Sequence, residues 1–140
     1  MATMKLQVIS PDAVVYEADI AMLVADATSG PIGILPMHLP MITGILPCAM
    51  RLKMEDGTQQ YLAVAGGFME VQRDKITVLA SCAERPEQID RNRAEQSLAR
   101  AKERIKTFQR GTKEAESIDI KRAELSLQRA LARLKSMEKI

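Results

Sequence analysis

At 140 residues, the chain has the size of one ordinary domain, or of a small domain that carries a helical appendage. Hydrophobic residues make up 46% and charged residues 27%, and no apolar run approaches the roughly 20 residues of a membrane span, so we expect no insertion into a membrane. The net charge of +2 is unevenly divided, because residues 1–83 hold five basic and eight acidic side chains and residues 84–140 hold fifteen and ten. The basic C-terminal half predicts an anionic partner. Three kinds of partner fit: a phosphate ligand, an acidic protein surface or nucleic acid.

The first half of the chain shows short apolar runs separated by turn signals, which is typical of an antiparallel sandwich or barrel. Residues 1–9 carry no secretion or import signal and indicate a cytosolic start. Pro11-Asp12 follows the first predicted strand, Asp56-Gly57 predicts a hairpin with a type I′ turn, and Arg73-Asp74 predicts another turn. We therefore predict a β domain over residues 1–84 with about ten strands between residues 4 and 82.

The second half changes to helical spacing and predicts a two-helix antiparallel hairpin over residues 85–140. Apolar residues recur at intervals of three and four in two stripes. The stripes are Ala94, Leu98, Ala101, Ile105 and Phe108, then Ile120, Ala123, Leu127, Ala130, Leu134 and Met137. Between them, Arg110-Gly111-Thr112 is a candidate C-cap, and Ser117 or Asp119 is a candidate N-cap. Because the stripes are narrow and rich in alanine, the hairpin can close on itself, dock on the β domain, or open towards another protein.

A polar row runs beside each apolar stripe and supplies the candidate binding residues. The rows are Asp90, Arg93, Ser97, Arg100 and Arg104 on the first helix, and Arg122, Ser126, Arg129 and Arg133 on the second. Arginines suit phosphate oxygens because each guanidinium donates two aligned hydrogen bonds. The alternative is a solvated, salt-bridged flank. Arg91 and Arg93 favour an anion, because both fall in the first turn of a helix capped by Asp90, where the helix dipole disfavours cations.

No local motif predicts catalysis or a resident metal. The glycines form neither GxxxxGK[ST] nor GxGxxG, so we expect tight turns rather than a phosphate loop. His38 is the only histidine, which favours an interface or packing role over a metal ligand. Cys48 and Cys82 belong to no Cys/His cluster and are predicted to be buried free thiols. An independent nucleic-acid-binding module remains an alternative, although Phe108 is the only aromatic residue after residue 68 and offers no stacking platform. A hydrolase would need turnover by the isolated chain, which we do not expect.

Three segments carry a resemblance to a known family. Residues 33–38 (GILPMH), 63–71 (AVAGGFMEV) and 122–125 (RAEL) resemble the epsilon subunit of bacterial F-type ATP synthase, in the same order and spacing, and the likeness runs from about residue 4 to 135. The resemblance implies a ten-stranded β-sandwich followed by a two-helix domain. It also implies a non-catalytic subunit of the central stalk, peripheral to the cytoplasmic face of the bacterial cell membrane, that couples proton flow to ATP synthesis and restrains ATP hydrolysis.

The partners and the ligand are likewise implied by the resemblance. The sandwich would attach to the gamma subunit and the membrane rotor ring of c subunits, with His38 at that interface. The helices, when extended, would reach the alpha and beta subunits of the catalytic head. Some members of the family bind ATP as a regulatory ligand through (I/L)DxxRA, which residues 89–94 match. The resemblance assigns Arg93, Arg100, Arg129 and Arg133 to the phosphates and Ile89, Asp90 and Ala94 to the adenine end, and Glu84 matches an acidic position of that site. No cofactor is expected to be required.

Overall fold

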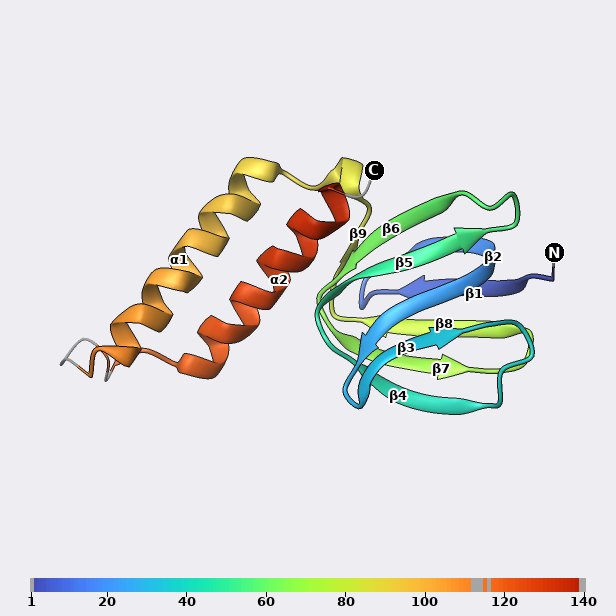
Figure 1. Ribbon diagram of the computed structural model, residues 1–140, viewed down its shortest axis with the longest axis horizontal. Helices are drawn as coiled ribbons and strands as arrows, with labels where there is room; N and C mark the ends of the chain where they lie inside the picture. The colour runs from blue at the N-terminus through green and yellow to red at the C-terminus, as the bar shows by residue number, and fades with distance from the viewer. Residues whose placement is uncertain (1, 112–114, 116, 139–140) are drawn as a thin grey trace.

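The computed structural model describes residues 2–111, 115 and 117–138 and consists of a β-sandwich followed by a helical hairpin (Figure 1). The strands are β1 (Met4–Ile9), β2 (Val14–Ala27), β3 (Gly30–Ile34), β4 (Met41–Ile45), β5 (Cys48–Met54), β6 (Gln59–Val64), β7 (Gly67–Val71), β8 (Lys75–Ala80) and β9 (Ala83–Glu84). A 3-10 turn, η1 (Pro86–Gln88), leads to α1 (Arg91–Gln109) and α2 (Ile120–Glu138). The predicted sandwich and hairpin are confirmed, and the described residues form nine strands where about ten were expected.

The long strand β2 joins the two layers of the sandwich. Its first part pairs with β1, and its second part pairs with β3 and β5. The remaining order, β1-β8-β7-β4 on one side and β5-β6-β9 on the other, completes the sheet. The expected antiparallel pairing is found throughout except between β1 and β8, which run parallel. These two strands lie side by side although most of the β domain separates them in the chain.

Alternating apolar residues fill the space between the layers. In β1 and β8 every second side chain is buried, which is the pattern of a strand with one face on the core. The largest fully buried side chains are Leu6, Ile20, Leu23, Ile34, Met50, Leu52, Leu62, Met69 and Ile76. Cys48 is buried in the same core, whereas Cys82 is half-buried, so the prediction of a buried thiol holds for the first cysteine only.

Turn chemistry fixes two connections of the sandwich. The predicted hairpin at Asp56-Gly57 is present, but the type I′ turn is wrong, because only Gly57 has a positive φ (87°). Asp56 instead accepts hydrogen bonds from the backbone N–H and the hydroxyl of Thr58, and the Gly57 N–H donates to the Met54 carbonyl, as in a three-residue loop. At Gly67 (φ 151°), a Cβ would lie 2.0 Å from the Leu79 carbonyl oxygen, so only glycine fits there.

The hairpin lies against the β5–β6 side of the sandwich, with α2 between α1 and the strands (Figure 1). A small apolar cluster joins the two parts: Ala63 of β6, Ile89 and Ala94 are buried, and Leu134 and Met137 of α2 pack on them. The predicted apolar stripes therefore face inward, except at Phe108, which is 40% exposed. Ala101 and Ala130 are 1% and 0% exposed, which shows how closely the two helices approach each other.

Candidate functional site

Local sequence places the start of each helix where the pattern predicted it. Asp90 accepts a hydrogen bond from the Arg93 N–H (3.1 Å), and Asp119 accepts one from the Arg122 N–H (3.2 Å), so both aspartates act as N-caps. At the other end of α1, Arg110 is the C-cap and Gly111 follows with φ 65°. The predicted caps are confirmed at these residues, while Thr112 lies outside the described residues.

A cavity of about 310 Å³ opens where the hairpin meets the end of the sandwich. Its walls come from β9, from η1 and the first turns of α1, and from one residue of α2. The lining residues are Cys82, Glu84, Gln88, Ile89, Asp90, Arg93, Ala94, Ser97 and Arg133. We call this space the first cavity. It combines two carboxylates and an amide with two guanidinium groups, so its walls can donate and accept hydrogen bonds.

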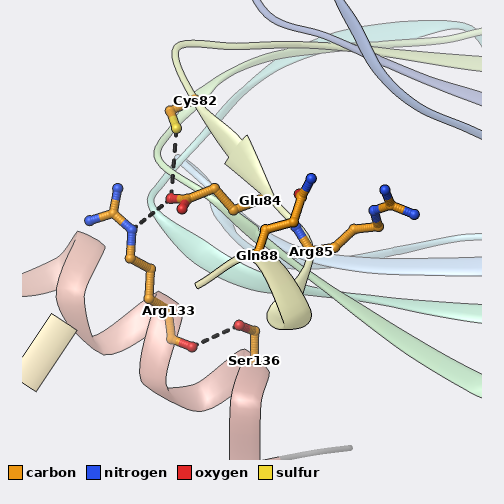
Figure 2. Close-up of polar contacts among 6 residues, drawn as sticks. All are labelled: Cys82, Glu84, Arg85, Gln88, Arg133 and Ser136. Carbon is orange, nitrogen blue, oxygen red and sulfur yellow. Dashed lines mark hydrogen bonds and ion pairs between the residues drawn. The ribbon is translucent and has the colours of Figure 1, made fainter. Parts of the chain in front are cut away.

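An ion pair crosses this cavity from the sandwich to α2. The Arg133 Nε donates to the Glu84 Oε1 at 2.7 Å, and the two side chains are 30% and 28% exposed. The Cys82 thiol donates to the same oxygen at 3.7 Å. In Figure 2 the two terminal nitrogens of Arg133 point away from Glu84. Glu84 therefore occupies one edge of the guanidinium and leaves its terminal N–H groups directed elsewhere.

A second cavity of about 360 Å³ lies between the two helices. Its lining residues are Ser97, Arg100, Ala101, Arg104, Ser126, Arg129 and Arg133. Ser97 and Arg133 also line the first cavity, so the two spaces adjoin. The Arg129 Nε is buried and has no hydrogen-bond partner among the described residues. A buried, unsatisfied donor on a cation is costly.

The structure brings the predicted site residues together at these two cavities. The first cavity holds Glu84, Ile89, Asp90, Arg93, Ala94 and Arg133, and the second holds Arg100, Arg129 and Arg133. The sequence did not predict Cys82 and Gln88 as site residues, because neither belongs to a row with helical spacing. The assignment by resemblance also omits Ser97, Arg104 and Ser126, although all three belong to the predicted polar rows.

The alternative of a salt-bridged flank describes a different part of the hairpin. Arg91 pairs with Glu95 at 3.2 Å on the exposed face of α1, with both side chains more than half exposed. Arg122 is exposed and lines neither cavity. The arginines thus divide into a solvated set and a set that converges between the helices.

Two side chains of the sandwich have pKa values shifted by burial. Burial raises the pKa of the Cys48 thiol, which sits in the core. Burial also raises the pKa of the Tyr16 phenol, and the nearby Arg85 partly offsets this.

In the part of the chain that the structure describes, no group of three or more His, Cys, Asp and Glu side chains could hold a metal ion. None of the described helices is long and apolar enough to span a bilayer.

His38 lies apart from both cavities, in the β3–β4 connection at the end of the sandwich remote from the helices (Figure 1). Its Nδ1 is 2.8 Å from the Leu39 carbonyl oxygen. Around it, Leu35, Met37 and Leu39 are 58%, 68% and 73% exposed, and Met37 adopts a positive φ of 69°. The loop therefore presents three large apolar side chains to the surroundings.

Comparison with known proteins matches both parts of the chain to one family. Residues 3–86 match the ATP synthase delta/epsilon chain β-sandwich domain, and residues 87–138 match the long α-helix domain of the same chain. An ATP synthase epsilon chain of Anoxybacillus flavithermus is 47% identical over 109 residues, which cover 78% of this chain and 81% of the relative. The epsilon chain of Bacillus subtilis is 47% identical over 105 residues, which cover 75% and 79%.

A solved structure shares the fold across nearly the whole chain. It belongs to the Euglena gracilis mitochondrial ATP synthase assembly of OSCP, F1 and c-ring, with a TM-score of 0.76 and 18% identity over 97% of this chain and 81% of that chain. Fold and family together define a non-catalytic subunit of a rotary ATP synthase, built from a β-sandwich and a helical pair. The chain belongs to the ATP synthase epsilon chain family. It is a subunit of the central stalk.

Proposed function

We propose that this stalk subunit restrains ATP hydrolysis through its helices and that the folded hairpin binds ATP as a regulatory ligand. The observation that carries the proposal is the convergence of arginines from both helices beside Glu84, at two adjoining cavities, one between the hairpin and the sandwich and one between the two helices. A ligand in this place contacts α1, α2 and β9 at once, so it stabilises their folded arrangement and no other.

The division of charge between the cavities supports the binding of a nucleotide in one orientation, with its base in the first cavity and its phosphates in the second. The first cavity contains the carboxylates and Gln88, which suit the hydrogen-bonding edges of a base, together with Ile89 and Ala94 as apolar surface. The second cavity contains Arg100 and Arg129, which suit the phosphates. Arg133 lies at the boundary and serves both cavities. Arg93, which the resemblance assigns to the phosphates, lines the first cavity, close to the proposed base end.

The energy available from these contacts matches what a hairpin switch requires. Each charge-assisted hydrogen bond contributes roughly 1.5 to 3 kcal/mol. Moving a two-state equilibrium from 1:99 to 99:1 takes about 5.5 kcal/mol of differential binding. Three guanidinium contacts made only in the folded hairpin would contribute about 4.5 to 9 kcal/mol, a range that includes this value. Without ATP, the narrow, alanine-rich contact between the helices leaves the hairpin easier to open.

We further propose that the sandwich attaches to the gamma subunit and the c ring on the cytoplasmic face of the membrane, and so couples proton flow to ATP synthesis. Two exposed apolar surfaces of the sandwich support this attachment. One is the His38 loop, with its three exposed apolar side chains. The other is the outer face of β4, β7 and β8, where Ile42, Phe68 and Leu79 are 74%, 62% and 52% exposed. Exposed apolar groups on adjacent strands are typical of a protein interface.

Inhibition is tested by adding the chain to an ATPase head depleted of its own epsilon subunit. We expect ATP hydrolysis to fall with the full chain and to recover with a chain that lacks residues 86–140. If the intact chain leaves hydrolysis unchanged, the regulatory part of the proposal is wrong. If the truncated chain inhibits equally, the helices are not the inhibitory element.

ATP binding is tested by calorimetry on the isolated chain. The double variant Arg93→Ala, Arg133→Ala should bind ATP far more weakly than the original chain. The matched control Arg91→Ala, Lys135→Ala removes the same number of charges from the same helices but changes residues that line neither cavity. Equal affinity in the original chain and the cavity variant would refute the site. Equal weakening by both variants would show diffuse charge attraction.

A further inference from the structure

The two helices of the hairpin repeat one sequence. Residues 89–104 and 118–133 both read IDxxRAExSLxRAxxR, with ten identical residues at sixteen positions. The (I/L)DxxRA motif therefore occurs twice. The two copies also start their helices in the same way, through the caps at Asp90 and Asp119. Because equivalent segments run antiparallel in the hairpin, the two helices are related by an approximate two-fold axis (Figure 1).

The central alanines of the two copies locate this axis. Ala101 and Ala130 occupy equivalent positions and are almost completely buried between the helices. A two-fold axis through this point exchanges Ser97 with Ser126, and Arg104 with Arg133. The second cavity is lined by both members of each pair, together with the equivalent Arg100 and Arg129. Its polar walls are therefore the same viewed from either end.

The second cavity is also strongly cationic. Four arginines line it, and its lining contains no acidic side chain among the described residues. Of the four, only Arg133 has an ion pair in the part of the chain that the structure describes. The buried Arg129 Nε lacks a hydrogen-bond partner there. Like charges held close together repel each other, so an anion that bridges them is stabilised by all four.

We propose that the second cavity binds an inorganic phosphate chain, of the triphosphate or pyrophosphate class, without a nucleoside. A chain with identical ends matches walls related by a two-fold axis, whereas ATP needs the first cavity for its different end. Arg104 and Arg133 close the two ends of the cavity and lie roughly 10 Å apart along the hairpin, at about 1.5 Å of rise per residue. This leaves room for several linked phosphates rather than one phosphate ion.

The proposal adds Arg104 as a ligand-binding residue. Arg104 lines only the second cavity, at the end farther from the first, and the ATP site proposed above does not include it. The present proposal rests on the proposed ATP binding in one respect, since the ATP site places the phosphates of ATP among the same central arginines. It follows that inorganic triphosphate and ATP compete, and that Arg104 is needed more by triphosphate than by ATP.

The test is calorimetry with inorganic triphosphate on the full chain, with Arg104→Gln as the cavity variant and Arg122→Gln as the control. Both side chains are exposed arginines of the same repeat, but Arg122 lines neither cavity. We expect one triphosphate per chain, displaced by ATP, and a loss of affinity of about tenfold or more in Arg104→Gln. Arg122→Gln should retain the original affinity. Pyrophosphate and orthophosphate, titrated in parallel, should bind progressively more weakly.

Several results would overturn the proposal. These are the absence of triphosphate binding, an unchanged affinity in Arg104→Gln, or an equal loss in both variants, which would indicate diffuse charge attraction. A parallel titration with ATP separates this failure from failure of the ATP site. Binding of ATP without triphosphate refutes only the present inference, and binding of triphosphate without ATP refutes only the nucleotide site.

Discussion

The ion pair between Glu84 and Arg133 should stabilise the docked hairpin by more than an ordinary surface pair. At 2.7 Å and an effective dielectric constant of about 20, the gross attraction is about 6 kcal/mol. Desolvation and side-chain ordering offset most of it, and the side chains are 30% and 28% exposed, so we expect a net coupling of about 1 to 2 kcal/mol. The measurement is a double-mutant cycle with Glu84→Gln, Arg133→Gln and both together. Urea unfolding is followed by the helical circular dichroism signal, which reports mainly on the hairpin.

The chain offers a matched control for this cycle. Arg91 and Glu95 form an ion pair within α1, at 3.2 Å and with side chains 59% and 53% exposed. A cycle on this pair should give only about 0.3 to 0.5 kcal/mol, because the pair is solvated and joins no separate elements. A coupling between Glu84 and Arg133 no larger than the control value would refute the view that this pair fastens α2 to the sandwich.

Three further changes test other parts of the fold. Gly67→Ala should lower the free energy of unfolding by more than about 3 kcal/mol, since the new Cβ meets the backbone of β8; an unchanged melting temperature would contradict this. Ala101→Leu should overpack the helix contact and cost roughly 1 to 3 kcal/mol, whereas Ala99→Leu on the exposed face should stay within about 0.5 kcal/mol, as urea unfolding can show. Iodoacetamide should label half-buried Cys82 before Cys48, because burial shields the Cys48 thiol and raises its pKa; Cys48 labelling should increase as the pH rises, and mass spectrometry showing the reverse order would refute this.

Local signals predicted the elements well because their causes are local. The caps at Asp90 and Asp119 depend on hydrogen bonds to the first turn of each helix, and the spacing of the alanines fixes which face is buried. In the sandwich, alternation of apolar residues located the strands. The turn type at Asp56 was wrong because a side chain competes with the backbone for the turn hydrogen bonds, and residue type alone does not decide that competition.

The sequence pattern did not predict the contacts between segments that are distant in the chain. The parallel pairing of β1 with β8 depends on how the layers close, and neither strand carries a mark of it. The Glu84–Arg133 pair joins residues far apart in the chain, so spacing could not reveal the bond. Arg104 is different, because the repeat of residues 89–104 at 118–133 is visible in the sequence. A comparison of the helices with each other would have marked Arg104 as the counterpart of Arg133.

The position of α2 between α1 and the sandwich determines what an opened hairpin would expose. Because α2 packs on β5 and β6 as well as on α1, extending it strips apolar contacts from both of its sides and uncovers the inner stripe of α1. A protein surface that captures the extended form must therefore cover two faces of one helix, as a groove does and a flat surface does not. The small side chains at these faces, with Ala123, Ala130 and Ala132 all buried, keep the area to be replaced small.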